Sequence, residues 1–159
     1  MCDESGFTII ELVVVIAIIA ILMSIATLDF SRLNKKSQIE SETRQVFHDV
    51  LTARQQALYT KNPTAVLLQA GSYIFKQYSS ESDATGATVS SQSVKYQLTA
   101  LNGSSIAGQS VMFDSSGVAT PGLTMQVNPS GSGAAIDCII IDTARTSLGV
   151  NQNGTCVIK

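Results

Sequence analysis

The strongest constraint on the fold of this chain is an apolar run from Phe7 to Leu28 that contains no glycine or proline. A helix over this range would be about 33 Å long, which is enough to cross a hydrocarbon core of about 30 Å. A buried strand would be much shorter. The run therefore predicts a membrane-spanning helix, although Glu11 places a carboxylate near its start.

Two ordinary explanations of this segment fit only in part. A secretory signal peptide would have a cleavage site at Ser24-Ile25-Ala26, but the residues before the run, MCDES, are acidic and contain no Lys or Arg. A plain membrane anchor conflicts with the positive-inside rule, because Arg32, Lys35 and Lys36 all follow the helix. Both explanations stay open as alternatives.

A third explanation accounts for the glutamate. The stretch Gly6-Phe7-Thr8-Ile9-Ile10-Glu11-Leu12 resembles the processing motif of type IV prepilins and type II secretion pseudopilins. This resemblance implies that residues 1–6 are a leader and that a prepilin peptidase cuts between Gly6 and Phe7. It also implies N-methylation of Phe7. The chain departs from the family in its short acidic leader and in Leu28, where many pilins have proline.

The resemblance also suggests a role for Glu11 in assembly. A carboxylate inside a membrane costs about 2.5–3.5 kcal/mol, so such residues usually have a partner. The amine exposed at Phe7 of a neighbouring subunit would offset this cost and set the axial register of packed helices. The plainer alternative is that the Glu11 side chain extends to the membrane–water interface, which its position near the start of the helix permits.

The helical pattern continues beyond the apolar run. Apolar residues between Ile39 and Leu58 recur mostly at spacings of three and four, with charged residues between them, as in an amphipathic helix. No glycine or proline occurs until Pro63. We therefore expect one helix with a membrane-spanning part, residues 7–28, and an amphipathic part, residues 29–62.

Residues 63–159 have the texture of an antiparallel β-rich head, so the predicted class is α+β. The segments 64–69 and 72–78 flank Ala70-Gly71 and predict a hairpin. Further strands are expected within 94–100, 110–113, 122–127, 135–142 and 155–159. Residues 79–93, rich in Ser, Thr, Gly and Ala, are expected to form a mobile loop.

A second resemblance lies in the head. The pattern Phe113-Asp114-x-x-Gly117-x-Ala119-Thr120-x-Gly122 is similar to the GspH/FimT-type head of minor pseudopilins and minor pilins. It implies a minor subunit of a type IV pilus or a type II secretion pseudopilus, acting in filament assembly or at the tip. The implied partners are other pilin or pseudopilin subunits, prepilin peptidase, an inner-membrane assembly platform and membrane lipid. The implied location is the bacterial inner membrane, with a single pass and the head in the periplasm, before assembly into the filament.

In an oxidising periplasm Cys138 and Cys156 are expected to form a disulfide, which would stabilise the head by roughly 3 kcal/mol. Two buried free thiols are the alternative. The sequence shows no catalytic set, metal-ligand spacing or cofactor motif around its single histidine, His48, so no enzyme, metal or cofactor is expected.

Nucleic acid is not an expected partner, because the C-terminal region offers only Arg145 and Lys159, and phosphate binding depends on several cations. A DNA-uptake minor pilin and a secreted or anchored β-rich binding module remain alternative functions.

Overall fold

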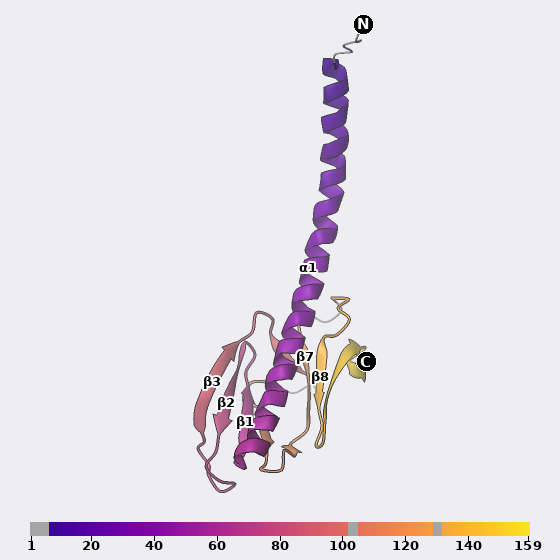
Figure 1. Cartoon of the computed structure of the whole chain (residues 1–159). Coiled ribbons are helices and arrows are strands. Elements are labelled where there is room, and N and C mark those ends of the chain that lie inside the picture. Colours follow the sequence, from indigo (N-terminus) through magenta and orange to yellow (C-terminus); the bar gives the residue numbers. More distant parts are fainter. Residues whose placement is uncertain (1–6, 102–104, 129–131) are drawn as a thin grey trace. The chain divides into compact units, whose positions relative to one another are not determined.

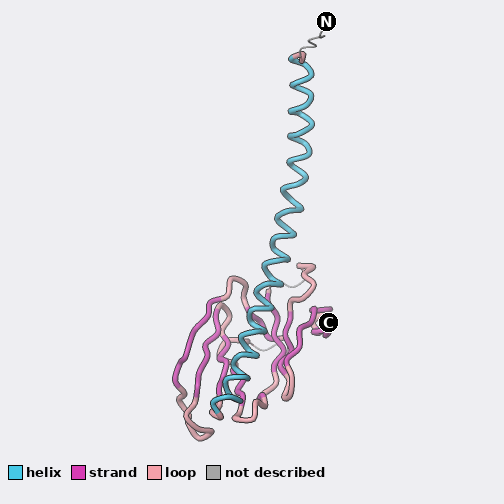
Figure 2. Tube along the Cα trace, in the orientation of Figure 1, coloured by secondary structure: helices cyan, strands magenta, loops and turns pink. Residues whose placement is uncertain are grey.

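The computed structural model describes residues 7–101, 105–128 and 132–159, with the backbone alone for residues 25–29. The chain divides into two compact units, residues 1–35 and residues 36–159. Helix α1 (Ile9–Thr60) contributes to both units, and every strand follows it in the sequence, as Figure 2 shows. The predicted α+β class, a long N-terminal helix followed by an antiparallel β-rich head, is confirmed.

The first unit is helical from Ile9 onward. Its large apolar side chains between Ile9 and Met23 are all exposed, with exposed fractions from 46% at Val15 to 85% at Ile9. Among the residues that the structure describes, no helix is long and apolar enough to cross a membrane.

In the second unit, one face of α1 packs against the strands. Its buried positions are spaced alternately by four and three residues, which places them on a single stripe: Ile39, Thr43, Val46, Val50, Ala53 and Ala57. The predicted amphipathic pattern is therefore the packing face of the helix. The helix ends at Thr60 because Lys61 adopts a positive φ of 56° and Pro63 cannot continue the hydrogen-bonding pattern.

In the part of the head that the structure describes, the strands form two five-stranded sheets whose pairings are all antiparallel. The first sheet has the order β3-β2-β1-β5-β6, and the second has the order β10-β9-β8-β7-β4. Figure 1 shows β1, β2 and β3 on one side of the helix segment of this unit, with β7 and β8 on the other side.

The bounds of the strands in the first sheet are β1 Thr64–Leu68, β2 Ser72–Gln77, β3 Ala87–Ser93, β5 Ser110–Phe113 and β6 Ala119–Thr120. Those in the second sheet are β4 Leu98–Ala100, β7 Leu123–Val127, β8 Cys138–Ile141, β9 Thr146–Gln152 and β10 Thr155–Ile158. The core lies between the two sheets and the helix stripe, and its largest fully buried side chains include Tyr73, Phe113, Leu68, Met125 and Ile139.

One expectation about the head was wrong, and a further strand was not predicted. Residues 79–93 are not one loop, because Ala87–Ser93 is strand β3, paired with β2. Nearly all of the β3 side chains are exposed, so no alternation of apolar and polar residues marked the strand. Strand β9, Thr146–Gln152, was also missed, because its apolar residues are few and Gly149 lies in its centre.

The glycine in β9 has a packing reason. A Cβ built on Gly149 would lie 2.6 Å from the Val157 carbonyl oxygen and 2.7 Å from the Cys156 sulfur. Only glycine allows β10 to approach this closely.

Candidate processing and assembly site

The start of α1 is capped by Thr8, a residue to which sequence reasoning assigned no role. The backbone N–H of Glu11 donates to Thr8 Oγ1 over 3.4 Å and to the Thr8 carbonyl over 3.1 Å, and the N–H of Leu12 donates to the same carbonyl over 3.3 Å. Thr8 is thus the N-cap and Glu11 the third helical residue, the spacing of a capping box. The pattern Thr-x-x-Glu ahead of the apolar run is the signal that could have identified the cap.

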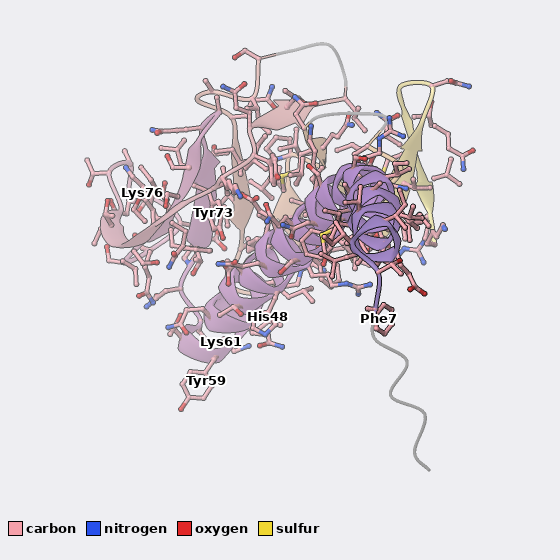
Figure 3. All side chains as sticks on the ribbon, turned by 90° about the horizontal axis from the view of Figure 1, so that it is seen from above. Phe7, His48, Tyr59, Lys61, Tyr73 and Lys76 are labelled. Atoms are coloured by element: carbon pink, nitrogen blue, oxygen red, sulfur yellow. A yellow bond between two sulfur atoms is a disulfide. The ribbon has the colours of Figure 1, made fainter. Side chains whose placement is uncertain are left out.

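Of the two predicted processing residues, the structure describes one. Gly6 is outside the described residues, whereas Phe7 is 80% exposed immediately before the helix and is labelled in Figure 3. Glu11 lies in the first turn of α1, where the partial positive charge of the helix N-terminus favours a carboxylate. The cap therefore satisfies a backbone N–H of the first turn, and the helix terminus favours the charge of the Glu11 side chain.

The helix that follows the cap presents apolar side chains on all sides. The consecutive residues Leu12, Val13, Val14 and Val15 point in four directions around the helix, and each is at least 46% exposed. An apolar surface of this extent marks a site that binds lipid or another protein surface. The arrangement therefore combines an accessible Phe7, a capped first turn and a helix with an extensive exposed apolar surface.

A second set of contacts fixes the head onto α1. The guanidinium of Arg54 donates from Nη1 to the Ala144 carbonyl over 3.0 Å and from Nη2 to the carbonyls of Thr143 and Asp142 over 3.1 and 3.2 Å. It also lies 5.2 Å from the centroid of the Phe113 ring. One helix side chain thereby holds the turn between β8 and β9 and packs on β5.

Two glutamates of α1 hold loops of the head in the same way. Glu42 accepts the backbone N–H of Tyr96 at 3.2 and 3.3 Å, and Glu40 accepts the N–H of Ala135 at 2.6 Å. The buried hydroxyl of Tyr73 donates to Asp49 Oδ2 over 2.5 Å. Burial, the hydrogen bond to Asp49 and the nearby carboxylates raise the pKa of Tyr73 well above its ordinary value.

The motif of the head resemblance forms a tight turn against the end of α1. Asp114 Oδ1 accepts hydrogen bonds from the Ser116 hydroxyl and from the N–H groups of Ser116 and Val118, and these bonds lower the pKa of Asp114. Gly117 has a φ of 75°, and a Cβ there would lie 2.9 Å from Leu58 Cγ. Both the conformation and the close approach to α1 therefore require glycine at this position.

The C-terminal strand is held by a disulfide between Cys138 and Cys156, whose Cα atoms are 6.0 Å apart. Next to it, the buried Asp137 accepts the N–H of Asn151 at Oδ1 over 2.6 Å, and Asn151 Nδ2 donates to Gln126 Oε1 over 2.7 Å. Burial raises the pKa of Asp137. Sequence reasoning identified the cysteines but gave Asp137 no role.

The remaining charged candidates are not brought together. His48 has 81% of its side chain exposed on α1, 3.9 Å from Asp49, and is labelled in Figure 3. Arg145 lies in the turn between β8 and β9, and Lys159 follows β10. Within residues 7–101, 105–128 and 132–159, no group of three or more His, Cys, Asp or Glu side chains is placed to hold a metal ion.

Two comparisons with known proteins gave a match, one to the N-terminal sequence and one to the fold. Residues 1–27 match the family described as "Prokaryotic N-terminal methylation motif". No curated protein sequence matches the chain. The structure is similar to that of the type IV minor pilin FimU of Pseudomonas aeruginosa, with a TM-score of 0.54 and 12% identity over 79% of this chain and 96% of that one. At this identity the similarity shows a shared fold, and the fold and the N-terminal motif together support the resemblance to the type IV minor pilin family.

Proposed function

We propose that this protein is a minor subunit of a type IV pilus or type II secretion pseudopilus, built into the filament through α1. One observation carries the proposal: a capped helix with apolar side chains exposed on all sides begins within the segment that matches the methylation motif, residues 1–27. Such a helix would contact lipid before assembly and the helices of neighbouring subunits in the filament. Its apolar surface would stay out of water in both environments.

Processing would occur between Gly6 and Phe7. The exposure of Phe7 ahead of the first helical turn supports this, because a peptidase requires an accessible, non-helical peptide bond. Cleavage would create a new amine at Phe7, and its methylation keeps a basic nitrogen at the N-terminus. The amine would then lie one turn from Glu11 along its own chain, and the two groups have opposite charge.

In the filament, we expect Glu11 to accept the Phe7 amine of an adjacent subunit. The helix N-terminus stabilises the carboxylate only in part, and an ion pair in a medium of low dielectric constant adds attraction that is specific to one axial offset. The pair therefore selects the register, while the apolar side chains supply most of the burial.

The surroundings follow from the same proposal. Before assembly, residues 7–28 would be held once across the bacterial inner membrane, with the head in the periplasm, where Cys138 and Cys156 are oxidised. The partners would be prepilin peptidase, an inner-membrane assembly platform, membrane lipid and other pilin or pseudopilin subunits. The role of the head is structural, at the filament surface or tip.

The test is mass spectrometry of the mature N-terminus, after expression with prepilin peptidase. The expected product begins at Phe7 and carries one methyl group. A matched Gly6→Leu variant should keep residues 1–6, because the peptidase would no longer cut. A mature chain that begins at Met1 or at Thr27 in the unaltered protein would overturn the proposal.

A further inference from the structure

A cavity of about 290 Å³ lies in the second unit, between α1 and the hairpin of β2 and β3. It exists because β3 continues the sheet beyond the helix without packing on it, so that nearly all β3 side chains remain exposed. The residues that carry the argument are Asp49 and Gln56 of α1, Thr64 of β1, Phe75 and Gln77 of β2, and Gln92 of β3.

The lining of this cavity has an unusual chemistry. Three amide side chains, those of Gln56, Gln77 and Gln92, converge on it from different elements, and each carries both donors and an acceptor. One N–H of Gln77 already donates to Thr60 Oγ1 over 3.3 Å, which leaves its other N–H and its oxygen. Asp49 adds a carboxylate, while none of the described lining residues is Lys, Arg or His. The walls therefore suit an uncharged ligand with many hydroxyl groups, and they disfavour an anion.

A buried polar atom at the cavity lacks a partner. Thr64 is only 3% exposed, and its Oγ1 has no hydrogen-bond partner among the described residues, although Thr64 lines the cavity. An unsatisfied buried hydroxyl costs about 1–3 kcal/mol, so a native structure usually supplies it with a partner. Because this oxygen has almost no accessible surface, a ligand hydroxyl reaches it only if the surrounding side chains shift.

The volume of the cavity limits the size of its ligand. At about 290 Å³ it lies at the small end of ligand sites, which begin at about 300 Å³. Asp49 in its lining also accepts the hydroxyl of Tyr73, which lines a second cavity of about 270 Å³. The space therefore fits a compact ligand.

We propose that this cavity, here called the amide cavity, binds a neutral saccharide of one or two rings. The ligand's hydroxyls would bond to the three amides and to Asp49. The half-buried ring of Phe75 offers the apolar face on which the C–H side of a sugar ring packs. This site belongs to the head and is independent of the assembly role of α1.

The test is saturation-transfer NMR on the full chain in lauryldimethylamine oxide micelles, a detergent without a sugar headgroup. The probes are glucose, galactose, mannose and their disaccharides maltose and lactose, with N-acetylneuraminic acid as the anionic comparison. We expect saturable binding of at least one neutral probe with a Kd of about 1 mM or tighter. We expect none for the anion.

Variants separate specific binding from surface contact. Gln56→Ala and Gln92→Ala should each weaken binding roughly tenfold, the effect of losing a good hydrogen bond. Gln55→Ala is the matched control, because Gln55 is exposed on the same helix but does not line the cavity. The proposal is overturned if no neutral probe saturates, if the anion binds equally well, or if Gln55→Ala weakens binding as much as Gln56→Ala.

Discussion

Replacement of Arg54 by methionine isolates the contact that fixes the head to α1. The wild-type guanidinium donates three hydrogen bonds to the carbonyls of residues 142–144 and lies 5.2 Å from the Phe113 centroid. Methionine keeps a long apolar stem, so that most of the packing survives while the donors and the charge are lost. The change therefore measures the polar part of the contact.

The expected loss follows from the surroundings of each bond. A hydrogen bond from a charged donor contributes about 1.5–3 kcal/mol when it is sheltered, but the three carbonyls lie in an exposed turn where water would replace the donors, so about 0.5–1 kcal/mol each is the better figure. The contact with Phe113 adds about 0.5–1 kcal/mol. Arg54 Nε is buried without a partner among the described residues. Its removal relieves that desolvation cost, which offsets part of the lost stability. We expect a net destabilisation of about 2–3 kcal/mol.

The assay is thermal unfolding of the full chain in detergent, followed by near-ultraviolet circular dichroism of its tyrosines. At about 2–4 °C per kcal/mol for a domain of this size, Arg54→Met should lower Tm by about 4–12 °C. Arg54→Lys should give a smaller decrease, because one ammonium group does not span three carbonyls. Arg44→Met, at an exposed position on the same helix, should change the stability by less than about 0.5 kcal/mol. Equal effects at positions 44 and 54 would refute the assigned role of Arg54.

Three further predictions concern assembly, the disulfide and pH. Glu11→Val should be cleaved and methylated yet be depleted from purified filaments, and normal incorporation would contradict the pairing with Phe7. Cys138→Ser, with the two cysteines 18 positions apart, should lower the unfolding free energy in denaturant by roughly 3 kcal/mol, whereas an unchanged midpoint would exclude a stabilising bridge. Because burial raises the folded-state pKa of Asp137 above its ordinary value of 3.8, this carboxyl favours folding at low pH and loses that contribution as the pH rises through the folded-state pKa. Asp137→Asn should therefore raise Tm most near neutral pH and progressively less below it, and a pH-independent difference would contradict this assignment.

Periodicity in the sequence predicted an element where one of its sides faces the core and the other faces solvent. The stripe from Ile39 to Ala57 was readable because one side of α1 meets the core and the other meets solvent. The β1–β2 hairpin was readable because a run of apolar residues flanks a turn at Ala70-Gly71. Strand β3 was not readable, because both of its faces are exposed and its residues carry no alternation.

The polar contacts of the head were equally hidden from the sequence. Arg54 meets a turn some ninety positions further along the chain, and Glu40 meets Ala135. A charged residue on an amphipathic helix occupies the same sequence position whether its side chain faces water or bonds to a distant loop. Only the fold distinguishes these cases, because the bond depends on which backbone groups of the head are left unpaired.

The N-terminal half of this protein was determined by local chemistry. An apolar run without helix breakers, preceded by Thr8 and carrying Glu11 in its first turn, defines a capped helix and a processing motif whatever follows it. The head depended on tertiary structure. Two sheets, an edge strand without a pattern and a cavity lined by three glutamines arise from pairings between distant segments, and the identities of single residues do not encode those distances.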